Sequence, residues 1–203
     1  EAGTVDGCDD PRLPTICALR RRGYTPSSIF NFVRNAGISK ANSLVDIDML
    51  EHCIREELNA DAPRRIAIEK PVKVVITNYD ADKVEYFDLP NNPNDENAGT
   101  RKLPFTRTLF VEREDVSLDP PPKYQRLKMD GYVRLKGAYI IHCDEVVQDE
   151  NGEVVELKCS YVPESRSSND TSGLKVRGTI QWVDGKTGVD AEIRKYAPLL
   201  KDA

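Results

Sequence analysis

YVRLKGAYIIHCDEVVQDENGEVVELKCSYV (residues 132–162) contains two runs rich in β-branched and aromatic residues. The runs, 132–147 and 153–162, flank the turn residues Glu150-Asn151-Gly152. Asn-Gly between two alternating runs is a strong signal for a β-hairpin. The segment therefore predicts two antiparallel strands joined by a tight turn, and it assigns this part of the chain to the β class.

Further strands are predicted on both sides of this hairpin, because apolar and polar residues alternate there with a period of two. They cover residues 72–78, 83–89, 106–113, 174–183 and 191–196. Two polar stretches between them, 90–101 and 163–173, are predicted to be long loops. Short strands with polar turns and many prolines favour β-barrels over a parallel sheet.

The first third of the chain is predicted to be helical. Three helices are expected, at 14–22, from Thr25-Pro26 to Gly37, and from Asp46 to Pro63, since apolar residues recur at i, i+3, i+4 and i+7 there. Thr and Asp are good N-caps, and Gly commonly follows the end of a helix. The fold class is therefore α+β by segregation, with a small helical subdomain followed by mainly antiparallel β-barrels.

Composition predicts a globular, cytoplasmic protein. The chain has 203 residues, a formal net charge of −5, 39% hydrophobic residues and 31% charged residues. No run reaches the roughly 18–20 apolar residues that a membrane helix needs. The first ten residues, EAGTVDGCDD, lack the charged-then-apolar pattern of a signal peptide. They also lack an initiator Met, and we interpret the chain as a fragment.

Residue types typical of catalysis or metal binding are sparse. The five cysteines are odd in number and none forms a CxxC motif, which predicts reduced thiols. Neither histidine, His52 or His142, has a partner at ligand spacing. Asp9-Asp10 before a Pro is typical of a helix entry, and the glycine loops GxGxxG and GxxxxGK[ST] are missing. We therefore predict no catalytic residue and no metal ligand.

A cationic segment, PKYQRLKMDGYVRLKGAYII (residues 122–141), interrupts this acidic chain. It carries five basic residues, Lys123, Arg126, Lys128, Arg134 and Lys136, against one acid, Asp130. Arg134 and Lys136 are spaced by two and so would share one face of a strand, while Val133 and Leu135 would share the other. The segment is either a solvated strand face or a surface for single-stranded RNA, whose bases stack on groups such as Arg or Tyr124.

Two other basic clusters have similar alternatives. Arg20, Arg21 and Arg22 lie at the C-terminus of a predicted helix, where they either complement the helix dipole or contact an RNA backbone. Arg64-Arg65 follows Pro63, and it is either a solvated linker or a guanidinium that hydrogen-bonds a base edge. Composition alone favours the linker.

Several longer stretches resemble one protein family. They are DDPRLPTICALRRRGYTPSSI, LEHCIREELNADAPRR, KYQRL…YVRLKGAYII and QWVDGKTGVDAEIRKY. In this order, and over nearly the whole chain, they resemble segments of the glutaminyl-tRNA synthetases, with the bacterial form more similar. The HIGH-type and KMSKR-type ATP-binding signatures of that family are absent from the sequence. The resemblance thus implies a fragment without the catalytic domain.

The resemblance implies three domains and a set of RNA-binding residues. The domains are a helical stem-contact subdomain (1–62), the first part of a proximal anticodon-binding β-barrel whose later strands are missing (63–119), and a distal anticodon-binding β-barrel (120–203). Residues matching the family's motifs for anticodon contact are Arg64 for the middle base, Arg126 for the third base, Arg134 near the first base, and Lys123, Gln125 and Lys136 beside them. Lys40 matches a residue that lies along the inside of the tRNA.

The implied function is tRNA binding with recognition of the anticodon. The full-length parent would attach glutamine to tRNA(Gln) with ATP and magnesium, whereas the fragment would hold no cofactor and have no ligase activity. The expected partners are tRNA(Gln), through its anticodon loop, and the parent's own catalytic domain, with the protein monomeric. Two alternatives are the same region of an archaeal- or eukaryote-type glutamyl-tRNA synthetase, and a structural module that does not bind RNA.

Overall fold

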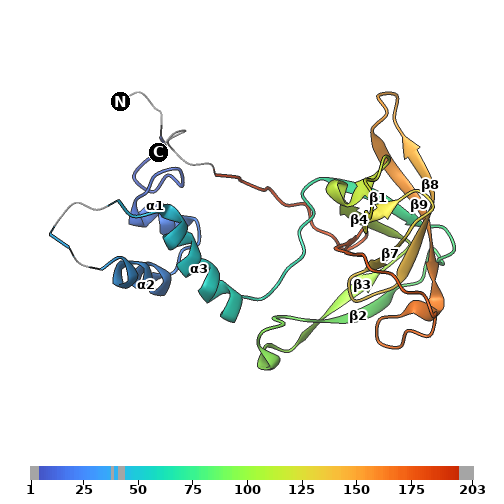
Figure 1. Cartoon of the computed structure of the whole chain (residues 1–203), viewed down its shortest axis with the longest axis horizontal. Coiled ribbons are helices and arrows are strands. Elements are labelled where there is room, and N and C mark those ends of the chain that lie inside the picture. The colour runs from blue at the N-terminus through green and yellow to red at the C-terminus, as the bar shows by residue number, and fades with distance from the viewer. Residues whose placement is uncertain (1–4, 38, 41–43, 197–203) are drawn as a thin grey trace. The chain divides into compact units, whose positions relative to one another are not determined.

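The chain forms two compact units in the computed structural model, which describes residues 5–37, 39–40 and 44–196. One unit consists of Glu1–Pro63, Asn92–Glu96 and Glu192–Ala203, and we call it the helical unit. The other consists of Arg64–Asn91 and Asn97–Ala191, and we call it the β-unit. Figure 1 shows the helices in the first unit and the strands in the second.

The helical unit contains three α-helices that begin at the expected caps. They are α1 (Ile16–Arg21), α2 (Pro26–Ala36) and α3 (Ile47–Asp61). The side chains of Thr15, Thr25 and Asp46 accept hydrogen bonds from backbone N–H groups in the first turns of these helices. None of the helices in the described part of the chain is both long enough and apolar enough to cross a membrane.

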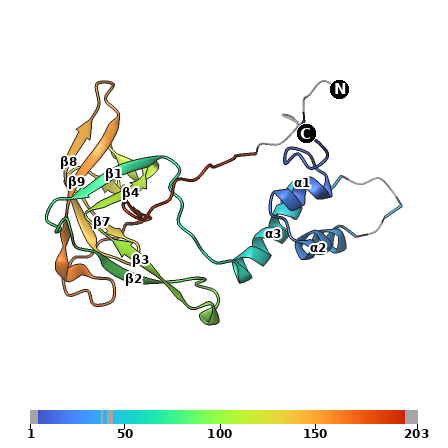
Figure 2. The ribbon, with the colours of Figure 1, turned by 180° about the vertical axis from the view of Figure 1, so that it is seen from behind.

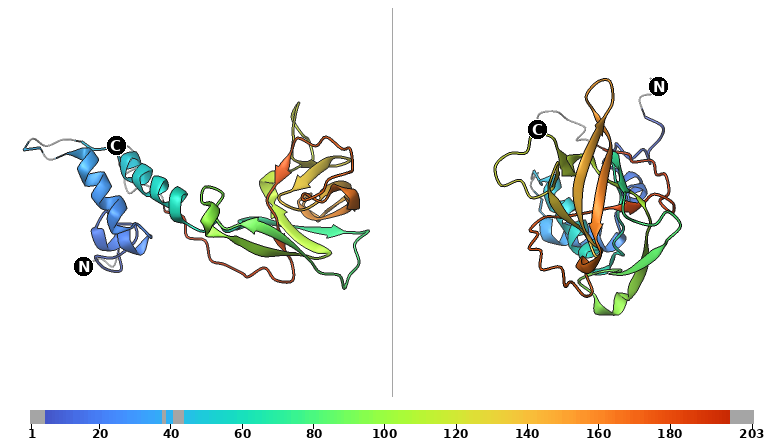
Figure 3. Two further views of the ribbon diagram at one scale, coloured as in Figure 1. Left: turned by 90° about the horizontal axis from the view of Figure 1, so that it is seen from below. Right: turned by 90° about the vertical axis from the view of Figure 1, so that its right-hand side faces the viewer.

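The β-unit is built on a seven-stranded mixed sheet with the order β10-β7-β8-β9-β1-β4-β11. Figures 1 and 2 label five of these strands, β1, β4, β7, β8 and β9. Its strands are β1 (Pro71–Ile76), β4 (Thr108–Glu112), β7 (Tyr132–Leu135), β8 (Ile140–Gln148), β9 (Val154–Val162), β10 (Thr179–Ile180) and β11 (Val183–Asp184). The predicted hairpin is confirmed, because β8 pairs antiparallel with β9. Figure 3 shows this long hairpin in its right-hand view.

Two smaller sheets and three short 3-10 helices complete the unit's secondary structure. β2 (Glu85–Pro90) pairs antiparallel with β3 (Thr100–Phe105), and β5 (Val116–Ser117) pairs parallel with β6 (Leu127–Lys128). The 3-10 helices are η1 (Glu96–Ala98), whose first residue belongs to the helical unit, η2 (Arg113–Asp115) and η3 (Pro163–Ser165). The α+β class, with helices first and mainly antiparallel strands after them, is confirmed.

Three strand predictions were wrong in their extent. Residues 132–147 do not form one strand, because a turn at Gly137 (φ 71°) folds β7 back against β8. Glycine suits that turn for a second reason, since a Cβ atom at Gly137 would lie 2.5 Å from Leu89 Cδ2. The predicted strand 174–183 contains only two short strands, β10 (residues 179–180) and the start of β11 (residues 183–184). The predicted strand 191–196 is absent, because these residues have no regular secondary structure.

The sheet also combines strands from both predicted barrels. β1, from the range 63–119, pairs parallel with β9, from the range 120–203, with Val74 opposite Leu157. β11 then pairs antiparallel with β4. The boundary at residue 119 therefore does not separate two sheets, although the assignment of 1–62, 63–119 and 120–203 as domains stays a prediction.

The core of the β-unit is aromatic at its centre. Phe105 is fully buried and makes edge contacts with Tyr79, Phe87, Tyr139 and Trp182, with ring centroids 5.1–5.8 Å apart. Such edge-to-face pairs are each worth about 0.5–1.5 kcal/mol beyond the area they bury. This cluster joins β3 to the turn between β7 and β8 and to the segment before β11.

Candidate nucleic-acid interface

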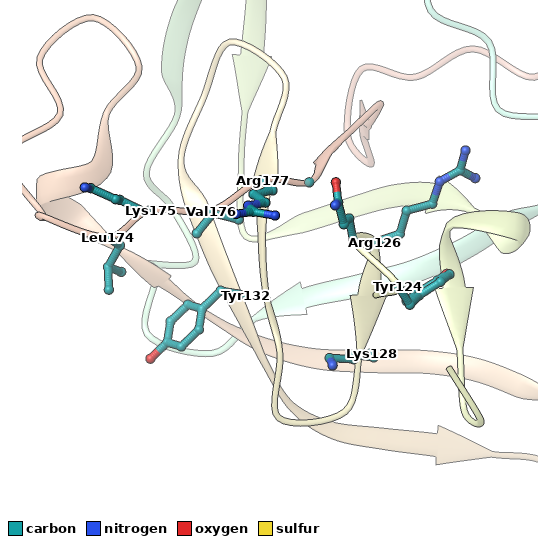
Figure 4. A pocket seen from close by; sticks show the side chains of 10 residues that line it. Tyr124, Arg126, Lys128, Tyr132, Leu174, Lys175, Val176 and Arg177 are labelled. Atoms are coloured by element: carbon teal, nitrogen blue, oxygen red, sulfur yellow. The ribbon is translucent and has the colours of Figure 1, made fainter. Parts of the chain in front are cut away.

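A cavity of about 240 Å³ lies in the β-unit, between the cationic segment and the chain leading to β10. Its lining is basic, aromatic and apolar, and comprises Tyr124, Gln125, Arg126, Lys128, Tyr132, Leu174, Lys175, Val176, Arg177 and Gly178. In Figure 4 the side chains of residues 174–177 lie on one side of this space, and those of Tyr124 and Arg126 lie on the other. None of the lining residues is acidic.

The wall formed by residues 124–128 is held by a short sheet and a turn. Leu127 is fully buried and pairs with Val116 in the parallel β5–β6 sheet, which fixes the residues on either side of it. Lys123 has a left-handed backbone (φ 68°) that non-glycine residues seldom adopt. The Tyr124 N–H donates to the Pro121 carbonyl at 3.0 Å, which closes the turn that brings Tyr124 to the cavity.

The opposite wall is formed by residues 174–178, and its backbone lies very close to that of Gln125 at Gly178. A Cβ atom at Gly178 would lie 1.4 Å from the Gln125 carbonyl oxygen, so no larger residue fits there. The Gly178 carbonyl accepts a hydrogen bond from Arg134 N–H at 2.9 Å, where β10 begins to pair with β7. Residues 174–177 consequently run beside the cationic segment, although they are about fifty positions later in the chain.

Arg126 is oriented by a carboxylate. Its Nη1 lies 2.7 Å from Asp115 Oδ1 and 3.5 Å from the Glu114 carbonyl oxygen. Burial raises the pKa of Asp115, and the positive charge of Arg126 partly offsets that rise. The arginine side chain is 54% exposed, and these contacts engage only Nη1. The remaining guanidinium donors therefore stay available to a ligand.

Tyr124 contributes a hydroxyl group that is shielded from solvent. Within the described part of the chain, this hydroxyl has no hydrogen-bond partner. Burial raises its pKa, while the charge of Arg126 acts in the opposite direction. A buried hydroxyl without a partner is costly, at about 1–3 kcal/mol. The hydroxyl is therefore a buried group of the cavity wall and is not exposed to a ligand.

Tyr132 is an exposed aromatic residue at the edge of the cavity. It is 47% exposed, and its ring lies 4.5 Å from the imidazole of His142. His142 is itself held by Asp144, 2.7 Å from Nδ1, and by Asp130, 3.1 Å from Nε2. The Tyr132 ring thereby has a fixed neighbour on one side and offers the rest of its surface to solvent.

Arg134 and Lys136 do not line the cavity, unlike Gln125 and Arg126. The guanidinium of Arg134 donates to the Ser165 carbonyl at 2.8 Å and pairs with the Asp170 carboxylate. Its side chain is only 21% exposed as a result. Lys136 is exposed in the turn after β7, where its backbone N–H donates to the Ile180 carbonyl. The prediction that Val133 and Leu135 share the other face of the strand is confirmed, and both are fully buried.

The other predicted RNA-binding residues are not among those that line this cavity. Arg64 begins the β-unit, and its backbone N–H donates to the Asn91 carbonyl. In the helical unit Arg20, Arg21 and Arg22 are exposed at the end of α1, and Lys40 is exposed in a bend. Arg21 pairs loosely with Asp9 at 3.4 Å, and the Arg22 guanidinium lies 5.5 Å from the ring of Tyr24.

Sequence patterns did not single out three cavity residues, Tyr132, Lys175 and Arg177. The alternation in residues 174–183 predicts a plain strand, which gives the cations no role. One signal was present in the sequence: Lys175 and Arg177 are spaced by two, as are Arg134 and Lys136, and Gly178 follows them directly. Such a glycine often marks a close backbone approach.

The sequence is similar to a known domain family and to several known proteins. Residues 62–162 match the anticodon-binding domain of the class I tRNA synthetases (E and Q). The chain is 52% identical over 202 residues to a glutamine–tRNA ligase of Clostridium perfringens, covering 100% of this chain and 37% of that protein. It is 48% identical over 197 residues to one of Rhodopirellula baltica, covering 97% of this chain and 33% of that protein. For a Pseudomonas aeruginosa relative the identity is 47% over 203 residues, covering 100% and 36%.

The chain spans about a third of the length of these curated relatives. The matched domain runs from β1 to β9 and so includes the cationic segment and the β8–β9 hairpin. The identity extends along the whole chain, from the helical unit to residues beyond β11. Through residues 62–162, the chain therefore belongs to the family of anticodon-binding domains of the class I tRNA synthetases for glutamate and glutamine.

Proposed function

We propose that this chain binds tRNA(Gln) and recognises its anticodon, with the cavity of the β-unit accepting a nucleotide of the unstacked anticodon loop. The observation that carries the proposal is the cavity itself, which an acidic chain lines with basic and aromatic side chains and with no carboxylate. Bases of single-stranded RNA are recognised by stacking on aromatic or guanidinium planes and by hydrogen bonds to their edges.

Arg126 has the geometry of a base-reading residue. Asp115 engages one nitrogen of the guanidinium, and the side chain stays 54% exposed, so the other donors are available to a base edge. A bidentate contact between arginine and a base edge is worth roughly 1–3 kcal/mol of discrimination. Gln125, beside it in the cavity lining, adds an amide that can donate and accept. The positive charge of the exposed Lys123, next to Tyr124 in the chain, would attract the RNA backbone.

Arg64 and Arg134 are assigned to the same anticodon loop, and Lys136 is assigned with them. Arg134 is held by Asp170, so a contact with RNA requires that this ion pair exchange for a contact with the ligand. Arg20, Arg21, Arg22 and Lys40 of the helical unit are assigned to the tRNA backbone, because they are exposed and basic. Phosphate contacts position the RNA, and base contacts supply specificity.

The longer protein to which such a region belongs would attach glutamine to tRNA(Gln) in the cytoplasm. The similarity to proteins named glutamine–tRNA ligases supports this proposal. ATP and magnesium would serve the part of that protein outside the aligned third. No group of three His, Cys, Asp or Glu side chains converges as a metal site in residues 5–37, 39–40 and 44–196, and we assign no step of ligation to this chain.

Competition binding tests the proposal. One competitor is a tRNA(Gln) transcript, and the other is the same transcript with its middle anticodon base changed. We expect the native chain to prefer the first, and Arg64→Ala or Arg126→Ala to lower that preference by roughly five- to a hundredfold. Lys158→Ala removes an exposed cation that pairs with Glu145 and should leave the preference unchanged. Equal losses for both transcripts in the arginine variants would show that neither residue recognises a base.

A further inference from the structure

We propose that Lys128 and Arg177 form a phosphate clamp, in which the two cations hold one phosphodiester group of the RNA strand from opposite walls of the cavity. The inference rests on the proposed function, since it names how the same site holds the RNA. Lys128 is the last residue of β6, and Arg177 precedes the close approach at Gly178. Neither residue was assigned a role by the resemblance or by the similarity to known proteins.

Among the described residues, no carboxylate neutralises the charge of Lys128 or Arg177. Within the described part of the chain, neither side chain makes an ion pair or a hydrogen bond to a carboxylate. Elsewhere in the β-unit, exposed lysines do pair: Lys73 with Glu156 at 2.8 Å, Lys102 with Asp88 at 3.0 Å, and Lys158 with Glu145 at 2.9 Å. Lys128 and Arg177 instead share a cavity whose lining holds no acidic residue.

The carboxylates of neighbouring segments are already engaged, so they do not neutralise these two cations. Asp115 holds Arg126 at 2.7 Å, and Asp130 Oδ1 lies 3.1 Å from His142 Nε2. Asp170, in the loop before residue 174, holds Arg134. The positive charge at the cavity therefore remains open to an anion from outside the chain.

The backbones that carry the two cations are fixed before any ligand binds. The Lys128 carbonyl accepts a hydrogen bond from Gly131 N–H at 3.2 Å, and the Lys128 side chain packs where a Cβ atom of Gly131 would clash with it. Arg177 is followed by Gly178, whose carbonyl is bonded to Arg134 N–H. Binding therefore needs only side-chain adjustment, which keeps its entropic cost low.

Chemistry favours a phosphate over a base edge as the ligand of this pair. Lysine is a compact point charge that suits phosphate but lacks the planar fork that distinguishes bases. Two cations from different walls can contact different oxygens of one tetrahedral phosphate. With Arg126 beside them to contact a base, the cavity would accommodate both parts of one nucleotide.

The test uses Lys128→Gln/Arg177→Gln, which removes both charges and keeps side chains of similar length. The matched control is Lys102→Gln/Lys158→Gln, which removes two exposed cations from β3 and β9. Binding of cognate and middle-base-swapped tRNA transcripts is measured from about 50 to 200 mM salt, where phosphate contacts dominate the salt dependence. Thermal unfolding of each variant checks that the β-unit stays folded.

We expect the cavity variant to bind both transcripts about tenfold more weakly than the control variant at low salt, with the anticodon preference retained. The slope of log K against log salt should fall by about 0.7 for each phosphate that the variant no longer neutralises. Affinity and slope equal to those of the control would overturn the clamp. A loss confined to one transcript would also overturn it, because these residues would then recognise a base. Absence of any anticodon preference in the native chain would instead contradict the proposed function.

Discussion

Glu85 is a partly buried carboxylate on which four side chains converge. Tyr79 and Tyr139 donate their hydroxyl groups to it at 2.9 and 3.0 Å, and Lys83 and Arg166 each pair with it at 3.3 Å. The network joins β2 to the aromatic centre of the core and to the loop after β9. Burial raises the pKa of Glu85, but the hydrogen bonds from the two tyrosines and Lys83 outweigh burial, so the net pKa is lowered.

The lowered pKa predicts a loss of stability in acid. Because the folded state binds a proton at Glu85 less readily than the unfolded chain, the carboxylate stabilises the fold above the ordinary pKa of 4.5. That contribution is lost as the pH falls through the lower, folded pKa. Urea unfolding followed by the fluorescence of Trp182, which is fully buried in the β-unit, measures this loss.

Glu85→Gln should make the unfolding of the β-unit less dependent on pH in this acidic range. At neutral pH we expect it to cost about 2 kcal/mol, since a hydrogen-bonded charge is replaced by a neutral amide. Asp88→Asn is the matched control, because Asp88 is an exposed partner of Lys102 on the same strand as Glu85. A Glu85→Gln chain with the native pH dependence would show that other carboxylates are responsible.

Single residues also show which parts of the site sequence patterns could find. Arg126 was predicted as a ligand-binding residue, and it lines the cavity. The engagement of Arg134 by Asp170 was not predictable, because the two residues are 36 positions apart and belong to a strand and a loop. A sequence pattern records a charge, but not the partner that tertiary structure gives it.

At the scale of secondary-structure elements, two glycines allow the strands around the cavity to pack. Gly137 turns β7 into β8, and Gly178 lets β10 approach the segment that carries Gln125. Only glycine fits at Gly178, because the Gln125 carbonyl oxygen occupies the space of a Cβ atom. The pairing of β10 with β7 therefore depends on a missing side chain.

Gly178→Ala should separate β10 from β7 and open the cavity. We expect a loss of about 3 kcal/mol in the free energy of unfolding, together with weaker binding of tRNA, because the backbone must move to relieve the clash. Gly152→Ala is the control: Gly152 has a φ of 83°, but a Cβ atom there would have no heavy atom within 4 Å. That change should cost only about 1 kcal/mol and leave RNA binding unchanged.

Urea unfolding and tRNA titration of the two alanine variants test this prediction together. Hydrogen exchange of the Arg134 amide, which donates to the Gly178 carbonyl, reports directly on the β7–β10 pairing. Similar stability and binding for the two variants would mean that the Gln125 segment can shift at little cost.

At the scale of the whole β-unit, Trp182 connects segments that are distant in the sequence. It is fully buried, its Nε1 donates to the Lys136 carbonyl at 3.0 Å, and its ring lies 5.3 Å from that of Phe105. The residue thus attaches the last part of the β-unit to the β7–β8 turn and to β3. It is also the chain's single tryptophan.

Trp182→Ala should destabilise the β-unit by about 3–5 kcal/mol, because it leaves a large cavity in the core. A domain of this size has a total stability of about 5–15 kcal/mol, so much of it would be lost. Trp182→Phe keeps an aromatic ring but loses the bond to Lys136, and it should cost about 1–3 kcal/mol. Urea unfolding followed by near-UV circular dichroism of the tyrosines ranks the variants. An alanine variant whose stability matches that of the native chain would contradict the central role of this side chain.

Local sequence sets the types of element and most of their positions. Helix caps at Thr25 and Asp46 and the turn at Asn151-Gly152 are local features, governed by hydrogen bonds and dihedral angles within a few residues. The spacing of the apolar residues is also a local feature, and it distinguishes the helical first third of the chain from the strands that follow. The cationic character of residues 122–141 was also visible, because charge is a property of composition.

How these elements combine is a property of the tertiary structure. The parallel pairing of β1 with β9 and the return of residues 174–178 beside residues 124–126 join parts of the chain that no local pattern relates. Both depend on burial of a shared core and on close backbone contact at Gly178. Lys128 and Arg177 could therefore not be assigned to one cavity from the sequence, since contacts between distant residues arise only when the strands assemble into the sheet and its core.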